Sequence, residues 1–142
     1  MRSGDRALTV YGGATGVAND PAAAPAGGGV LFVASPSRGN DWGFVSARAA
    51  SAWVASRRLW LWRPGGSARA VPGAPRGAYL PMFTGRPGYA LVVADGGVWR
   101  VNLTGGRSQE VVGGFLSQTL DAVFGFYGYR RDVAASFAFA PV

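Results

Sequence analysis

Glycine and proline interrupt this sequence throughout, and no other feature constrains its fold more. The 142 residues include 23 Gly and 9 Pro, which separate apolar, β-branched or aromatic runs of roughly three to eight residues. Strands fit between such interruptions, whereas a helix of ordinary length needs a longer uninterrupted run. We therefore expect an almost all-β protein whose Gly and Pro residues lie in turns.

The first expected strand is Leu8–Tyr11, and from Gly12 to Gly29 a Gly-, Ala- and Pro-rich segment without periodicity predicts a long loop or arm. Residues 1–29 thus form an N-terminal strand and arm, and residues 30–142 form one β domain. A helix is the alternative for the Ala-rich Ser46–Ala55 and for Phe115–Phe124, whose apolar residues share a helical face. The strands expected in the β domain are Val30–Ala34, Gly43–Ala47, Trp53–Ala55, Arg58–Arg63, Ala68–Val71, Tyr79–Phe83, Tyr89–Ala94, Val98–Leu103, Glu110–Val112, Ala122–Tyr129 and Ser136–Ala140.

An internal repeat is the most informative pattern. Residues 54–62 align with residues 93–101 at a constant offset of 39, which places Trp60 over Trp99. Both copies continue into a Gly-Gly turn and then, with a one-residue slip, into a short strand that ends in Gly, Ala70–Gly73 and Glu110–Gly113. The order strand, strand, glycine turn and strand therefore occurs twice.

These units resemble blades of TolB-like β-propellers. The resemblance covers about residues 30–113 and implies propeller-like blades. The first unit departs from the family pattern, since Ser37 stands where the family turn has Asp and an insertion lies around Arg48–Ser56. The residues that carry the resemblance are Ser35–Gly39, Phe44–Ser46, Leu59–Trp62, Gly65-Gly66 and Ala70-Val71 in the first unit, and Phe83-Thr84, Gly88, Leu91–Val93, Val98–Val101, Gly105-Gly106 and Val111-Val112 in the second.

A closed propeller needs at least about four blades of about 40 to 45 residues, so this chain supplies two or three and cannot close a ring alone. Either several chains build the ring, or the chain is a fragment, or the repeat is a pair of meanders in another β fold. We expect antiparallel meanders that form a sandwich or open barrel, or two to three propeller-like blades, with a long Gly/Ala/Pro-rich N-terminal arm.

The residue types limit the chemistry available. The chain has no His, Cys or Lys, the usual sources of a group that titrates near neutral pH. Its acidic residues are solitary and mostly lie in turn-like contexts, and Asp95-Gly96 predicts a hairpin turn. The glycine clusters lack the setting of a nucleotide-binding loop. We expect no enzyme activity, no cofactor and no metal site.

Charge and aromatic residues suggest where partners bind. The net charge of +7 favours an anionic partner, such as nucleic acid or an acidic protein surface. Alternation along the strand around Trp60 places Arg58, Trp60 and Trp62 on one face, as a platform for bases or sugar rings or as residues packed in the core or an interface. The candidate binding residues are Arg58, Trp60, Trp62, Arg63, Trp99, Arg130 and Arg131.

The leading hypothesis is a non-catalytic structural or interaction subunit of a larger assembly, such as a virion, tail, surface layer or multi-subunit complex. Its partners would be other protein subunits in a homo- or hetero-oligomer. The alternatives are a propeller- or sandwich-type binding module for carbohydrate or nucleic acid, and a fragment of a propeller hydrolase. The sequence offers neither the apolar stretch of a signal peptide nor a run of about 18 to 20 apolar residues, so we expect a cytoplasmic chain or one assembled into a particle. The absence of Lys and Ile indicates a high-GC genome.

Overall fold

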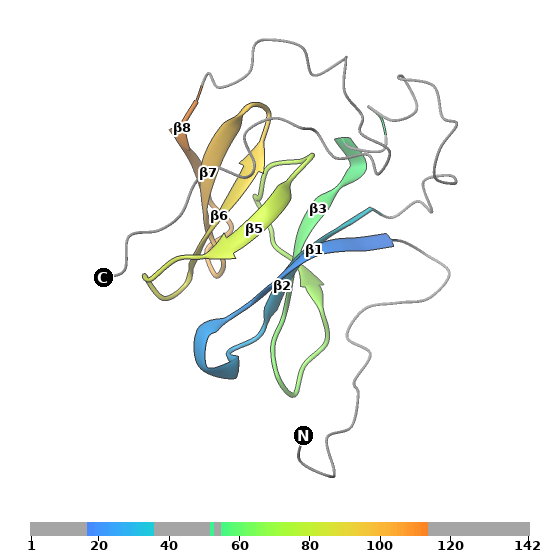
Figure 1. The fold of residues 1–142 in the computed structure, drawn as a ribbon, viewed down its shortest axis with the longest axis vertical. Coiled ribbons are helices and arrows are strands. Elements are labelled where there is room, and N and C mark those ends of the chain that lie inside the picture. Colours follow the sequence, from blue (N-terminus) through green and yellow to red (C-terminus); the bar gives the residue numbers. More distant parts are fainter. Residues whose placement is uncertain (1–16, 36–51, 53–54, 114–142) are drawn as a thin grey trace.

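The computed structural model describes residues 17–35, 52 and 55–113, which form two antiparallel four-stranded sheets. Sheet A contains β1 (Val17–Ala23), β2 (Val30–Ser35), β3 (Arg58–Trp62) and β4 (Arg69–Ala70), and a 3-10 turn, η1 (Pro25–Gly27), joins β1 to β2. Sheet B contains β5 (Tyr79–Phe83), β6 (Tyr89–Ala94), β7 (Gly97–Asn102) and β8 (Ser108–Val112). Within each sheet the strands follow their order in the chain (Figure 1). The predicted all-β class built from antiparallel meanders is confirmed.

Local sequence predicts most of the described strands. β5 and β6 have the expected ends, and β2, β3, β4, β7 and β8 lie within about two residues of theirs. Of the expected strand Trp53–Ala55, only Ala55 is among the described residues, and there the prediction is wrong. Ala55 has a helical backbone, as do Ala52 and Ser56, because alanine favours a helical turn. The expected segments Leu8–Tyr11, Gly43–Ala47, Phe115–Phe124, Ala122–Tyr129 and Ser136–Ala140 lie outside the described residues.

β1 corrects the prediction of a loop from Gly12 to Gly29. Its composition is poor for a strand, yet Val17–Ala23 pairs antiparallel with β2. A bulge between Asn19 and Ala22 contains Asp20, whose φ is 51°, and Pro21. Proline is tolerated in a sheet at edge strands and bulges, and β1 is an edge strand. Pairing with the apolar β2, more than propensity, therefore creates this strand.

The hairpin between β6 and β7 has the turn that its sequence predicts. Ala94 pairs with Gly97, which leaves Asp95 and Gly96 as a two-residue loop. Their φ angles are 47° and 71°, as a type I′ turn requires. This turn fixes the register of the whole hairpin.

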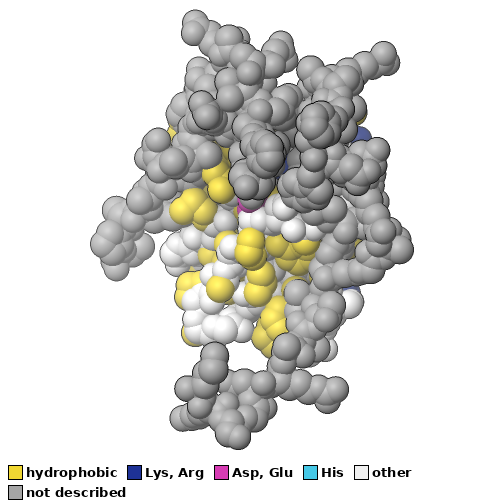
Figure 2. Space-filling model, turned by 45° about the vertical axis from the view of Figure 1, so that its right-hand side comes forward, with side chains coloured by type: hydrophobic (Ala, Val, Ile, Leu, Met, Phe, Trp, Pro, Cys, Tyr) yellow, Lys and Arg dark blue, Asp and Glu magenta, His cyan; other side chains and the backbone are white. Residues whose placement is uncertain are grey.

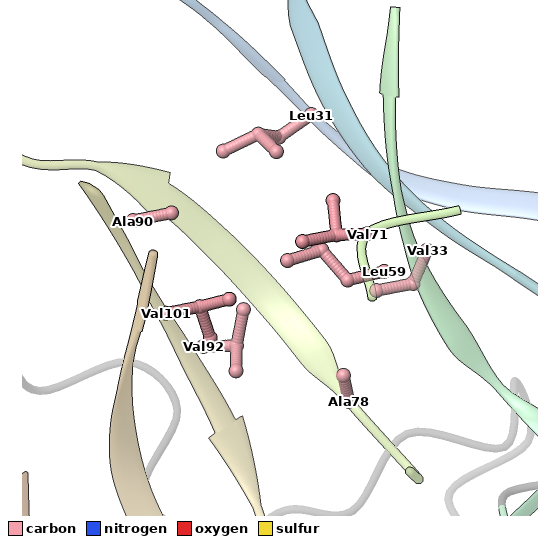
Figure 3. Close-up of a cluster of buried hydrophobic side chains, with 8 residues drawn as sticks. All are labelled: Leu31, Val33, Leu59, Val71, Ala78, Ala90, Val92 and Val101. Atoms are coloured by element: carbon pink, nitrogen blue, oxygen red, sulfur yellow. The ribbon is translucent and has the colours of Figure 1, made fainter. Parts of the chain in front are cut away.

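The two sheets pack on each other through different faces. We call one face of each sheet its leucine face; it carries Leu31, Val33 and Leu59 in sheet A and Leu91, Val93 and Val98 in sheet B. The opposite face of each sheet is its tryptophan face; it carries Val30, Phe32, Trp60 and Trp62 in sheet A and Ala90, Val92, Trp99 and Val101 in sheet B. Side chains of the leucine face of sheet A and the tryptophan face of sheet B share one buried cluster (Figure 3). The two sheets therefore pack head-to-tail, which means that unlike faces meet.

The inner edge strands β1 and β5 lie side by side in the middle of the molecule (Figure 1). Both strands carry a bulge, and in both the residue with positive φ stands directly before a proline, Asp20 in β1 and Leu80 in β5. The Leu80 backbone N–H donates to Asp20 Oδ2 at 3.3 Å. One side chain thus connects the two bulges and the two sheets.

Replacing Asp20 with Ala should lower the free energy of unfolding by about 1 to 2 kcal/mol. The change removes the acceptor of the Leu80 N–H and places Ala in a left-handed conformation that Asp tolerates better. Urea denaturation followed by Trp fluorescence measures the loss. Asp20→Asn is the control, since it keeps both an acceptor oxygen and this tolerance. Equal losses for the two variants would contradict the assignment.

Candidate functional site

The tryptophan face of sheet A is the surface that the sequence predicts as a binding platform. The register of β3 against β2 confirms the alternation, with Leu59 and Leu61 toward sheet B and Arg58, Trp60 and Trp62 on the opposite side. The Trp60 ring stacks on Phe32, with ring centroids 6.3 Å apart and 16° between the planes. Trp60 and Trp62 are half-buried. No strand of the described part covers this face.

The leucine face of sheet B is the second surface without a covering sheet in the described part. Tyr79, Val93 and Val98 form a small cluster at its centre, with Leu80 and Leu91 packed against them. Val93 and Val98 are buried, whereas Leu91 is half-buried and Arg100, its partner across the strands, is exposed. This face is therefore apolar in the middle and charged at its rim.

β8 supplies an exposed sheet edge. Val111 and Val112 are 43% and 47% exposed, and β8 pairs only with β7 among the described strands. Hydrophobic side chains are also visible across the described surface in Figure 2. An edge strand with exposed valines is a template on which another strand can add.

The remaining predicted site residues do not join this platform. Arg63 is exposed directly after β3. Trp99 lies in sheet B, where it packs against the buried cluster and donates from Nε1 to the Ala94 carbonyl oxygen at 3.0 Å. Arg130 and Arg131 lie outside the described residues. Arg58, Trp60 and Trp62 are thus brought together on one strand, and Trp99 is separated from them.

A cluster of two arginines and one tyrosine at one end of sheet B is a site that the sequence analysis misses. The guanidinium carbons of Arg86 and Arg100 lie 4.8 and 5.7 Å from the centroid of the Tyr89 ring. Arg100 Nη2 also donates to Gln109 Oε1 at 2.8 Å. The Asp95–Gly96 turn is the sequence feature from which this cluster could have been predicted. The turn sets the register of β6 and β7, and this register places Arg100 opposite Leu91 and diagonal to Tyr89.

The described surface is rich in unpaired positive charge. Its acidic side chains are only Asp20, Asp95 and Glu110. None of the exposed arginines of this part has a carboxylate partner within it. These arginines are Arg58, Arg63, Arg69, Arg76, Arg86, Arg100 and Arg107.

Other kinds of site find little support in the same part of the chain. Residues 17–35, 52 and 55–113 contain no group of three or more Asp, Glu, His or Cys placed to hold a metal ion. They also contain no helix with the length and apolarity that a membrane span requires. Comparisons with protein-family models, curated proteins and solved structures found no match to this chain. The features of the described residues that can bind a partner are therefore the sheet faces, the β8 edge and the exposed arginines.

Proposed function

We propose that this chain is a non-catalytic interaction subunit that joins other protein subunits in a larger assembly. The observation that carries the proposal is Trp62, a large aromatic side chain that is only half-buried at the end of β3. Large aromatic side chains contribute strongly to interface energy. The exposed edge of β8 adds a second means of attachment.

The resemblance to TolB-like blades supports the same role. Two four-stranded meanders in chain order, with the inner strands β1 and β5 adjacent, fit two successive blades. A closed propeller contains at least about four blades. Blades of this kind would therefore need further sheets from partner subunits.

The size of the protein in a native extract tests this role. Size-exclusion chromatography of an extract from cells that make the chain should place it well above the mass of one chain. Trp62→Glu should shift it to the mass of a monomer, because the substitution puts a charge on the tryptophan face. Ser67→Glu, an equal charge change in the exposed β3–β4 loop, is the control. Wild-type chain that elutes as a monomer from the native extract would overturn the proposal.

A second candidate function is binding to an anionic partner such as nucleic acid. It is favoured by the arginines at Tyr89 and by the surplus of exposed arginine over acidic residues. Two guanidinium groups at one ring repel each other, and a phosphate group between them would neutralise that repulsion. Phosphate contacts of this kind give binding that weakens steeply with salt.

The double variant Arg86→Ala/Arg100→Ala should weaken binding to a single-stranded oligonucleotide. A plot of log K against the logarithm of the salt concentration has a negative slope. Loss of two phosphate contacts should make this slope less steep by about one to two. Fluorescence anisotropy over a range of salt concentrations measures this slope. Arg69→Ala/Arg76→Ala removes the same net charge elsewhere and should change the slope less. Equal slopes for the two double variants would exclude a specific role of the Tyr89 cluster.

A further inference from the structure

The edge strand β1 contributes little to the interior of the fold, whereas its neighbour β2 lies at the centre of it. None of the β1 side chains from Ala18 to Ala23 is buried, but β2 is buried from Leu31 to Ser35. β1 therefore serves mainly to pair with one edge of β2. A strand that buries so little apolar surface can leave this edge with a small loss of apolar contact, and the open edge of β2 then needs another strand.

The connection from β1 to β2 has an unfavourable backbone conformation. It consists of residues 24–29, which include the turn η1 (Figure 1). Ala26 and Gly27 have φ angles of 55° and 73°, and the left-handed region is strained for alanine. The Ala24 N–H closes the connection by donating to the Gly29 carbonyl oxygen at 2.8 Å. When extended, six residues span about 20 Å and need no positive φ, so extension releases the strain at Ala26.

From these two observations we infer that two copies of the chain exchange β1. In this reciprocal dimer β1 of each copy pairs with β2 of the other copy, and residues 24–29 are extended. The contacts that β1 makes inside one chain form again between chains, including the hydrogen bond from the Leu80 N–H to Asp20, so the dimer needs no additional free surface. The inference rests on the proposed interaction role and names a second copy as a partner.

Two opposing effects set the population of this dimer. Release of the strained connection favours exchange, as is general for short strained hinges. Dilution favours the closed monomer, because two chains form one dimer. The dimer therefore belongs to high protein concentration, and its dissociation constant depends on the backbone strain in residues 24–29.

Substitutions in the connection should shift the equilibrium in opposite directions. The purified full chain is refolded from urea at several concentrations and then analysed by analytical ultracentrifugation, and the wild type should contain dimer at the highest of them. Gly27→Ala adds a strained residue to the closed connection alone, so it should lower the dissociation constant of the dimer by about thirtyfold or more, since each dimer relieves two connections. Ala26→Gly removes strain from the closed connection and should raise the dissociation constant.

Gly65→Ala is the matched control for Gly27→Ala. The two glycines have similar φ angles of 78° and 73°, and a β-carbon on either would meet nothing within 4 Å. Gly65 lies in the connection from β3 to β4, which keeps its conformation when β1 is exchanged. Its replacement should therefore leave the dissociation constant unchanged. Equal effects of the two substitutions would contradict the assignment of residues 24–29 as the hinge.

Cysteine cross-linking distinguishes exchanged strands from any other dimer, and it remains decisive if a hinge variant fails to fold. The chain contains no cysteine, so Ala18→Cys/Ala34→Cys introduces the only two thiols, at positions that pair across β1 and β2. The Cα atoms of such a pair lie about 4.5 to 5.5 Å apart, which suits a disulfide. The isolated dimer, oxidised and then denatured without reductant, should migrate as two covalently joined chains.

Two outcomes would overturn the inference. One is a wild-type chain that stays monomeric at its highest soluble concentration after refolding. The other is a dimer whose disulfides all lie within single chains. If the chain still elutes at high mass from the native extract, either outcome contradicts strand exchange alone, and the interaction role stands. A monomer in both experiments contradicts the interaction role as well.

Discussion

Leu59→Ala should lower the free energy of unfolding by about 3 kcal/mol, a large part of the stability of a small domain. Leu59 is fully buried in the cluster between the sheets. Truncation removes apolar contacts and leaves a cavity that two paired sheets cannot collapse to fill. Urea denaturation followed by circular dichroism measures the loss. Val111→Ala, at a side chain that is 43% exposed, should change stability by less than about 0.5 kcal/mol.

Double-mutant cycles show whether this loss comes from the contact between the sheets. Leu59 and Val92 belong to the same cluster, whereas Val98 belongs to the other cluster on the far side of sheet B. Leu59→Ala should therefore be coupled with Val92→Ala by at least about 0.5 kcal/mol and additive with Val98→Ala. Additivity in both cycles would contradict the packing of the leucine face of sheet A on sheet B.

Local sequence determines the strands that lie between strong turns. β6 ends and β7 begins around Asp95-Gly96, whose positive φ angles suit only a few residue types. The alternation in β3 likewise predicts which side chains face sheet B, because apolar and aromatic residues alternate with a period of two. Fold class, strand positions and the composition of the Arg58, Trp60 and Trp62 face therefore follow from the sequence.

Features that depend on contacts between distant segments do not follow from it. β1 is a strand only because β2 pairs with it, and Pro21 at its bulge argues locally against a strand. Trp99 matches Trp60 in the sequence repeat but packs against the buried cluster between the sheets, whereas Trp60 lies on the side of sheet A that faces away from this cluster. Similarly, Arg100 approaches the Tyr89 ring only because of the register between β6 and β7. Sequence thus identifies the residue types of the site, and packing decides which of them remain available.

Gly73→Ala should destabilise the fold by about 2 to 4 kcal/mol, although Gly73 is exposed. Gly73 lies in the connection from β4 to β5, with φ +65°, and a β-carbon there would overlap the carbonyl oxygen of Gly106. Ser108 Oγ also donates to the Gly73 carbonyl oxygen at 2.7 Å. An alanine therefore costs about 1 to 2 kcal/mol for its left-handed backbone, and it also forces the connection away from the β7–β8 turn.

Gly65→Ala separates these two costs. Gly65 has φ +78°, but a β-carbon there would meet nothing within 4 Å. Its replacement should therefore cost only the backbone term of about 1 to 2 kcal/mol, and Gly73→Ala should exceed it by about 1 kcal/mol or more in urea denaturation. The excess measures how firmly the connection between the sheets is held against sheet B. Equal losses at the two positions would mean that this connection moves freely, and that the close approach of Gly73 and Gly106 contributes nothing to holding the two sheets together.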